Sequence, residues 1–256
     1  MKIVAMIPAR YNASRFPAKL MQDLEGKPVI VRTFQAVVAT QLFDKVYVVT
    51  DDERIGQSIK EHGGEVIYSR KEHQSGSDRL AEACEFLDVD VIVNVQGDEP
   101  FTQKESLSLL IDIFKKDSCR EVDVATLMEE IDNPEDISNP NNVKVVVNKN
   151  CDALYFSRAF IPFPRDPDSG LYHKHIGIYA YRKSALMAFS QLSESMLEKT
   201  EKLEQLRYLE NGFKIRLALT KQSTIGIDTE ADLIKARKLW RETQQNQKIK
   251  IFEYYF

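Results

Sequence analysis

The sequence predicts an α/β fold built on a doubly wound, mostly parallel sheet, and two observations carry this prediction. Strand-like and helix-like segments alternate through the first half of the chain, which is the pattern of parallel strands joined by crossover helices. The run at residues 90–95 (DVIVNV) is apolar and largely β-branched, as expected for a strand that is buried on both faces.

In the first half, composition and turn residues place each element. A helix-like segment begins near Lys27-Pro28, and another is expected over 52–62, where two glycines end it. A third helix is expected over 75–87, because Leu80, Cys84 and Leu87 recur at helical spacing. Four segments of this half are strand-like: 2–7, 45–50, 65–68 and 90–95.

After about Glu121 strand-like segments follow one another, which indicates an antiparallel lobe inserted in a single domain of residues 1–256. This lobe is expected over roughly 122–182. The strands expected beyond Glu121 are 122–128, 143–148, 153–157, 175–181 and 214–219, with helices over 199–210 and 229–241. The tail at 243–256 is polar and then apolar, and two alternatives stay open: it docks on the body or a partner, or it is disordered.

Composition excludes several classes of protein. The net charge of −4 leaves no global basic field for nucleic acid, so a local basic site suits a small anionic ligand. Cys84, Cys119 and Cys151 are far apart and odd in number, which favours a reduced, cytoplasmic setting over a disulfide framework or zinc site. The sequence shows neither a signal peptide nor an apolar run long enough to insert in a membrane.

The loop after the first strand is the strongest candidate site. It begins at Pro8-Ala9-Arg10 and continues through Arg15 to Lys19, so three cations follow the carboxyl end of a strand. These cations and the free backbone amides suit a triphosphate. Neither G-x-G-x-x-G nor G-x-x-x-x-G-K-[ST] occurs here, which argues against a dinucleotide-binding oxidoreductase and against a P-loop enzyme.

Acidic residues provide a second and a third candidate site. The run Asn94-Val95-Gln96-Gly97-Asp98-Glu99-Pro100 lies at the carboxyl end of the strand at 90–95, and its carboxylates are the hard oxygen ligands that Mg²⁺ prefers. Asp228 precedes the last helix. The alternative interpretation is that Asp98 and Asp228 only cap helices, and both roles are compatible for Asp228.

A fourth candidate is the run from His73 to Arg79, which leaves a strand and opens a helix. Ser75 or Ser77 is suited to cap that helix. The small polar group His73-Gln74-Ser75-Gly76 also offers contacts for the edge of a nucleotide base.

Several longer blocks occur in one order from about Lys2 to Lys238: IPARYNASRFPAK, HQSGSDRLAE, NVQGDEPF, ALYFSRAFIPF, HIGIYAYRKSAL, KLEQLRYLENG and GIDTEADL. In these blocks the chain resembles the 3-deoxy-manno-octulosonate (KDO) cytidylyltransferase family. The resemblance implies a nucleotidyltransferase-type fold, dependence on Mg²⁺ and a homodimer with CTP and KDO as substrates. The implied reaction joins CMP to the anomeric 2-hydroxyl of KDO, with release of pyrophosphate, for lipopolysaccharide biosynthesis.

The resemblance also implies roles for individual residues. The implied metal ligands are Asp98 and Asp228, and the lobe at 122–182 would bind the sugar and form the dimer. The CTP phosphates would contact Arg10, Arg15 and Lys19, and the rest of the nucleotide site would contain Pro8, Ala9, His73, Gln74, Ser75, Gly76 and Arg79. The sugar acid would contact Gln96, Arg158, His175, Tyr179, Glu204 and Gln205. Departures from the family pattern are Ala18 and Leu20-Met21, which border Lys19.

The chemistry of the second half agrees with a sugar-acid site. Arg158 can pair with a carboxylate through two parallel hydrogen bonds. His175 and Tyr179 are four apart on a predicted strand, so both face the same side. Glu204 and Gln205 lie on a predicted helix and can bind hydroxyls. Each of these residues alone also fits an ordinary structural role, such as a solvated helix acid or a core aromatic.

Three rival functions remain at this point. The nearest is a cytidylyltransferase for a related ulosonic acid, of the 8-amino-KDO or sialic acid type, because discrimination there rests on few hydroxyl contacts. A nucleotide-binding protein without catalysis is disfavoured by the acids and cations retained at Asp98, Asp228, Arg15 and Lys19. An NAD-linked oxidoreductase is disfavoured by the missing glycine pattern.

Overall fold

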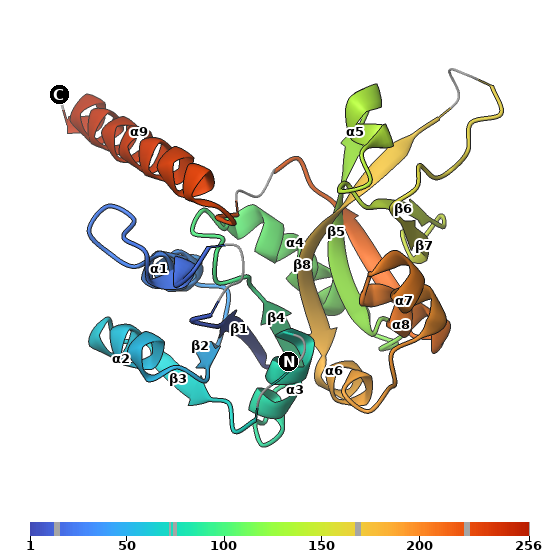
Figure 1. Ribbon diagram of the computed structural model, residues 1–256, viewed down its shortest axis with the longest axis horizontal. Coiled ribbons are helices and arrows are strands. Elements are labelled where there is room, and N and C mark those ends of the chain that lie inside the picture. Colours follow the sequence, from blue (N-terminus) through green and yellow to red (C-terminus); the bar gives the residue numbers. More distant parts are fainter. Residues whose placement is uncertain (13–15, 72, 74–75, 167–169, 223–225, 256) are drawn as a thin grey trace.

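The computed structural model, shown in Figure 1, describes residues 1–256 except 13–15, 72, 74–75, 167–169, 223–225 and 256. For residues 246–255 it describes the backbone only. One sheet of nine strands runs through this described part of the chain, in the order β3-β2-β1-β4-β8-β5-β9, with β6 and β7 beside the main path.

The first half forms the parallel part of the sheet, as the alternation of segments predicts. β1 (Ile3–Ala9) lies between β2 (Lys45–Thr50) and β4 (Val91–Asn94), and β3 (Glu65–Tyr68) pairs with β2; all these pairs are parallel. Chain order therefore reverses direction at β1, so the carboxyl ends of β1 and β4 meet at a switch point where ligands bind in such folds. The predicted α/β class with a mostly parallel sheet is confirmed.

The second half continues the same sheet with antiparallel strands. β8 (Tyr172–Arg182) lies between β4 and β5 (Val124–Ile131), antiparallel to both, and β9 (Ile215–Leu219) is parallel to β5. β6 (Lys144–Val147) and β7 (Ala153–Ser157) pair beside the first half of β8. The strands expected to form an antiparallel lobe thus share the main sheet through β5 and β8.

The register of β8 places a tyrosine at the switch point. Tyr179 pairs with Asn94, the last residue of β4, and with Thr126 of β5. The pairing then shifts, so that Leu127 lies opposite Ile176 and two residues of β8 have no partner on β5. A bulge of this kind bends a strand and increases its local twist. The first half of β8 therefore pairs with β6, and the second half pairs with β4.

Helices cover both faces of the sheet (Figure 1). One core, which includes Ile3, Ala5 and Ile7 of β1, packs against α1 (Val29–Ala39) and α4 (Lys104–Lys116). The other core includes Val4 and Met6. Alternate residues of β1 thus enter opposite cores, as the strand period of two requires. The helices of this second core are α3 (Gly76–Cys84), α6 (Lys183–Phe189) and α8 (Gln205–Glu210).

The remaining helices are short or lie at the edges of the sheet. α2 (Glu53–Glu61) follows β2 and α5 (Pro134–Ser138) precedes β6, while η1 (Lys19–Met21) is a single turn after the β1 loop. The single helix expected over 199–210 is wrong. A capping box at Ser195 begins α7 (Met196–Glu201), and Lys202, with φ 54°, takes the left-handed conformation that ends it.

The last helix is longer than its sequence pattern predicts. α9 (Glu230–Tyr255) continues past the expected end at residue 241, so the tail extends the helix. Its first part is anchored on the body: the Trp240 ring lies 5.9 Å from that of Phe101 and 4.4 Å from the Arg32 guanidinium. Beyond this anchor α9 projects from the body (Figure 1). Within the described chain, no helix combines the length and apolar character needed to cross a bilayer.

A buried ion pair generates a test of the fold. Arg182 of β8 and Asp117 after α4 have side chains that are 6% and 4% exposed, with Nη2 2.5 Å from Oδ2. We expect Arg182→Met to lower the free energy of unfolding by about 3–5 kcal/mol, because it leaves the Asp117 carboxylate buried and unpaired. Urea unfolding measures this loss.

The exposed pair Lys214–Glu121 is the matched control, with side chains that are 37% and 58% exposed. Lys214→Met should cost less than about 1 kcal/mol, because water screens such pairs. Equal losses in the two variants would contradict the assigned importance of the buried pair.

Candidate active site

Two loops approach each other closely at the carboxyl ends of β1 and β4. A Cβ atom on Gly97 would lie 3.1 Å from the Pro8 carbonyl oxygen, which is closer than nine in ten real Cβ contacts. The Gly97 carbonyl accepts a hydrogen bond from Thr33 Oγ1 at 2.9 Å. The Ile227 amide donates to the Asp98 carbonyl at 3.0 Å. Gly97 therefore permits a junction where the loops carrying Asp98 and Asp228 are tied together.

At this junction the Lys19 ammonium bridges two carboxylates. Its Nζ donates to Asp98 Oδ2 and, at 2.9 Å, to Asp228 Oδ1. Burial lowers the pKa of Lys19, but the hydrogen bonds and charges of the two aspartates outweigh it and raise the pKa overall. Three residues that the sequence singles out separately thus form one cluster, and both aspartates face a single cation position.

The cluster fits a divalent cation. Mg²⁺ in nucleotide sites is usually held by one or two carboxylates together with substrate phosphates and water, and Asp98 and Asp228 supply the carboxylates. The neighbouring Glu99 differs in kind, because burial first and the charge of Asp98 second raise its pKa to about 8. A carboxyl that is mostly protonated near pH 7 is a poor cation ligand. No group of three metal-binding side chains occurs among the described residues.

A polar cavity of about 620 Å³ opens at the carboxyl ends of β1 and β2, and Arg10, His73 and Arg79 line it. Arg10 Nη2 donates to the His73 carbonyl at 2.9 Å, which joins the β1 loop to the segment before α3. His73 Nε2 lies 2.6 Å from Glu82 Oε2. Burial raises the pKa of Glu82, but bonds from His73 and from the Arg70 amide outweigh it, and the pKa is lowered overall. Glu82 therefore holds the His73 ring.

Arg79 lines the polar cavity, and its guanidinium also has partners within the protein. Its side chain is 2% exposed, and its two terminal nitrogens contact both carboxylate oxygens of Asp51 at 3.0 and 2.9 Å. Nη1 also donates to the Ala9 carbonyl at 3.3 Å. The guanidinium hydrogen bonds lower the pKa of Asp51. Arg79 thus connects the ends of β1 and β2, and direct contact with a nucleotide stays a prediction.

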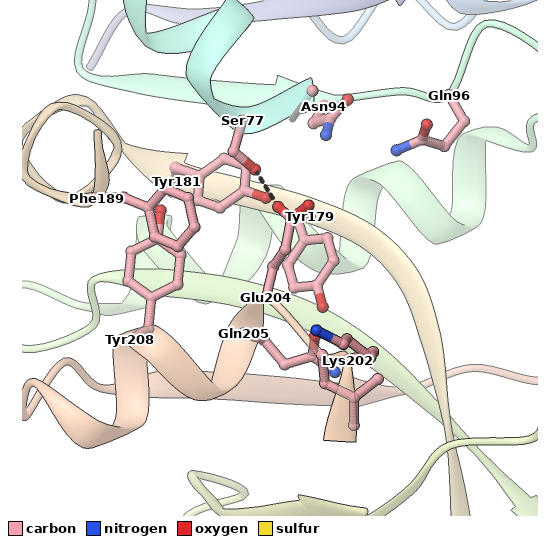
Figure 2. Close-up of a pocket in the computed structure, with 12 residues that line it drawn as sticks. Ser77, Asn94, Gln96, Tyr179, Tyr181, Phe189, Lys202, Glu204, Gln205 and Tyr208 are labelled. Carbon is pink, nitrogen blue, oxygen red and sulfur yellow. Dashed lines mark hydrogen bonds between the residues drawn. The ribbon is translucent and has the colours of Figure 1, made fainter. Parts of the chain in front are cut away.

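A second cavity of about 310 Å³ lies between α3, β8 and α8 (Figure 2). Four residues predicted for the sugar acid line it: Gln96, Tyr179, Glu204 and Gln205. Gly76, predicted for the nucleotide, also lines it. Ser77 Oγ donates to Glu204 Oε2 at 3.3 Å, and partial burial of the Glu204 carboxyl outweighs this bond and raises its pKa. This wall is rich in groups that bind hydroxyls.

Sequence reasoning assigned no ligand contact to several other residues that line this cavity (Figure 2). Asn94, Tyr181, Lys202 and Tyr208 all face this cavity. The Oδ1 atom of Asn94 and the hydroxyl of Tyr208 are buried, and neither has a hydrogen-bond partner within the described part of the chain. Signals for three of them existed: Asn94 ends the strand before Gln96, Tyr181 is two residues from Tyr179, and Tyr208 is one helical turn from Glu204.

Two residues predicted for the sugar acid lie outside this cavity lining. His175 is behind Tyr179, with ring centroids 5.3 Å apart, so the prediction that both face one side is confirmed. The Arg158 guanidinium donates hydrogen bonds to the backbone carbonyls of Glu201, at 2.7 Å, and Lys202, at 3.4 Å. Arg15, Gln74 and Ser75 are outside the described residues, so their predicted contacts remain predictions.

Comparison with known proteins agrees with this geometry. The sequence profile described as cytidylyltransferase matches residues 4–215. The 3-deoxy-manno-octulosonate cytidylyltransferase of Flavobacterium johnsoniae is 57% identical over 94% of this chain and all of its own length, and that of Christiangramia forsetii is 56% identical over 93% and 96%. The chain belongs to the 3-deoxy-manno-octulosonate cytidylyltransferase family.

Solved structures support this membership of the KDO cytidylyltransferase family. A CMP:2-keto-3-deoxy-manno-octonic acid synthetase complexed with CTP is 41% identical, with a TM-score of 0.90 over 95% of this chain and all of that one. A 4-diphosphocytidyl-2C-methyl-D-erythritol synthase from Anaerococcus prevotii is 15% identical, with a TM-score of 0.60 over 94% and 98%. The second likeness shows a shared fold alone.

The enclosure of His175 generates a pH prediction. Burial lowers the pKa of His175 to about 3, and its ring contacts Phe156 and the Thr126 hydroxyl. An unfolded chain takes up this proton near pH 6.5, whereas the native state stays neutral until about pH 3. The unfolded state therefore binds more protons in this window, so stability is lost as the pH falls from about 6.5 toward 3.

We expect this group to cost about 1–2 kcal/mol of stability between pH 7 and pH 5. His175→Gln should remove that part of the pH dependence, because glutamine does not titrate. Chemical denaturation of both proteins at the two pH values measures the difference. Identical pH slopes in the two proteins would show that His175 gains its proton normally in the native state.

Proposed function

We propose that this protein transfers CMP from CTP to the anomeric 2-hydroxyl of KDO, giving CMP-KDO and pyrophosphate. The Lys19–Asp98–Asp228 cluster is the observation that carries the proposal. Arg10 of the β1 loop lines the polar cavity, and Gln96 of the β4 loop lines the cavity rich in hydroxyl-binding groups. Lys19 and Asp98 follow on these same two loops and meet each other. The cluster therefore connects a nucleotide site with a sugar-acid site.

The reaction forms one bond and breaks another at the same phosphorus. The KDO hydroxyl attacks the α-phosphorus in line with the departing pyrophosphate, and the hydroxyl proton is lost. Arg10 and Lys19 stabilise the negative charge that builds on pyrophosphate, and Arg15 belongs to the same loop. The mechanism requires no nucleophile from the protein.

We propose that Asp98 and Asp228 hold Mg²⁺. An ion held by these two carboxylates would neutralise phosphate charge and lower the pKa of the attacking hydroxyl. The two carboxylates at present surround the Lys19 ammonium. With these carboxylates on a divalent cation, Lys19 would be available to bind phosphate, since its ammonium is a compact charge on a flexible stem.

The sugar-acid cavity supports recognition of a polyhydroxylated substrate. Glu204 and Gln205 present an acceptor and an amide from α8, and Gln96 lies across the cavity (Figure 2). The unpartnered Asn94 oxygen and Tyr208 hydroxyl are further groups that a substrate hydroxyl or an ordered water can satisfy. Leaving such groups unpaired is costly, so a polar ligand is favoured over an apolar one.

We propose further that the enzyme is a cytoplasmic homodimer that supplies CMP-KDO for lipopolysaccharide biosynthesis. Exposed apolar side chains around β7 and β8 support a subunit interface in the 122–182 lobe, since contiguous apolar surface favours association. Phe163 is 76% exposed and Leu171 is 61% exposed, and the rings of Phe160 and Phe163 are 5.7 Å apart. A solution mass of one chain would contradict the dimer.

Pyrophosphate release tests the proposed reaction. We expect release with Mg²⁺, CTP and KDO together, and much less when UTP or ATP replaces CTP, or when a sialic acid or 8-amino-KDO replaces KDO. Release with another acid alone would reassign the sugar-acid site. Folded protein that binds CTP but turns over no acid would contradict the enzyme function.

The metal assignment is tested by amide replacements. Asp98→Asn and Asp228→Asn each remove a charged cation ligand while keeping side-chain size, so turnover should fall at least about 100-fold with little change in Tm. Asp112→Asn, on the exposed face of α4, is the control and should keep near-normal rates. Excess chelator should abolish activity and added Mg²⁺ should restore it; normal rates in chelator would refute the assignment.

A further inference from the structure

Lys144, the first residue of β6, is a fully buried lysine, and within the described part of the chain its ammonium hydrogen-bonds to backbone carbonyls and forms no ion pair. It is 0% exposed. Its ammonium donates three hydrogen bonds to backbone carbonyls: Asn139 at 2.9 Å, Asn142 at 2.5 Å and Arg158 at 2.8 Å. An ammonium has three donors, so all of them are satisfied. Such complete satisfaction is what the burial of a lysine requires.

The three carbonyls come from two segments that Lys144 holds together. Asn139 and Asn142 belong to the connection between α5 and β6, and Arg158 follows the end of β7. The Arg158 side chain adds a further tie, since Nη1 donates to the Pro140 carbonyl at 3.1 Å. The α5–β6 connection and the end of β7 thus form a single unit around the ammonium.

This unit is attached to the wall of the sugar-acid cavity. The Glu201 carboxylate accepts hydrogen bonds from Ser157 Oγ at 2.6 Å and from the Arg158 amide at 2.9 Å. In return, the Arg158 guanidinium donates to the carbonyls of Glu201 and Lys202, at the carboxyl end of α7. The last carbonyls of a helix lack partners within the helix, so Arg158 satisfies the end of α7.

The turn between α7 and α8, which these contacts hold, carries side chains that line the cavity. Lys202 adopts the left-handed conformation, and the next residues to line the cavity are Leu203, Glu204 and Gln205. Their direction depends on where α7 ends and α8 begins. The contacts therefore run from the Lys144 ammonium through Arg158 to the turn that carries Glu204 and Gln205.

We propose that Lys144 is a positioning residue for the sugar-acid site. Its three hydrogen-bond acceptors lie outside the cavity lining, and it acts by fixing Arg158 and, through Arg158, the Lys202–Gln205 turn. This inference rests on the proposed function for the identity of the substrate. The chain of contacts from Lys144 through Arg158 to the turn is independent of that function. Loss of the ammonium should therefore disturb the sugar-acid side of the site and leave the nucleotide side intact.

Lys144→Met is the primary test, because it keeps an apolar stem and removes all three donors. We expect the KM for KDO to rise about ten-fold, while the KM for CTP changes less than about two-fold. Hydrogen exchange should become faster in peptides that cover 202–206. Glu201→Gln is the second variant if Lys144→Met does not fold, because its amide cannot accept both bonds; it should give the same pattern.

Lys183→Met is the matched control. Lys183 Nζ also donates to backbone carbonyls, those of Glu85 at 3.0 Å and Leu87 at 2.6 Å, but these lie away from the cavity. This variant should lower Tm without separating the two KM values. A merely structural lysine would behave like Lys183.

The outcomes separate failure of the inference from failure of the proposed function. A folded Lys144→Met enzyme with an unchanged KM for KDO, or with equal rises in both KM values, would overturn the positioning role. If the wild-type protein does not turn over KDO, the proposed function fails, and hydrogen exchange still decides the inference. Unchanged exchange over 202–206 in Lys144→Met would then refute the positioning role. Faster exchange there in Lys144→Met, without a similar increase in Lys183→Met, would support it.

Discussion

The contact on which the site depends is the bridge from the Lys19 ammonium to Asp98 and Asp228. These residues are far apart in the sequence, and each is delivered by a different element: the turn after β1, the loop after β4 and the segment before α9. Two carboxylates this close repel each other unless a cation lies between them. The ammonium satisfies this requirement in the structure, and the proposed reaction assigns the same position to a divalent cation.

The mixed sheet explains how one chain builds two different cavities around this bridge. Parallel strands bring β1 and β4 to a switch point, which suits the nucleotide. Insertion of antiparallel β8 beside β4 then places Tyr179 opposite Asn94, within the same layer. A purely parallel sheet would end at this edge, and the aromatic wall of the sugar-acid cavity would be absent. The lobe is therefore part of the site as well as an appendage.

The sequence predicts the sheet well and singles out each member of the cluster separately, because both results depend on local patterns, whereas the meeting of the three side chains depends on tertiary packing. Alternating segments and short polar motifs at strand ends identify β1–β4, Lys19, Asp98 and Asp228 from few residues. Two features escape such reasoning. The break between α7 and α8 depends on the left-handed conformation of one residue, Lys202, and the spacing of apolar residues does not predict it. The partners of buried polar groups, such as Glu82 for His73 and Asp51 for Arg79, depend on tertiary packing.

The anchoring of α9 has a mechanical consequence for the bridge. Two arginines of α9 attach the helix to the body in addition to Trp240. Arg237 donates to the Asp23 carbonyl at 2.8 Å, and Arg241 forms an ion pair with Glu25. Those partners follow η1, which contains Lys19, while α9 itself follows directly after Asp228. The helix α9 thus fixes the distance between the backbone that carries Lys19 and the backbone that carries Asp228. If a divalent cation replaces the ammonium, as proposed, a change of the Lys19 rotamer would be sufficient and the main chain would keep its path.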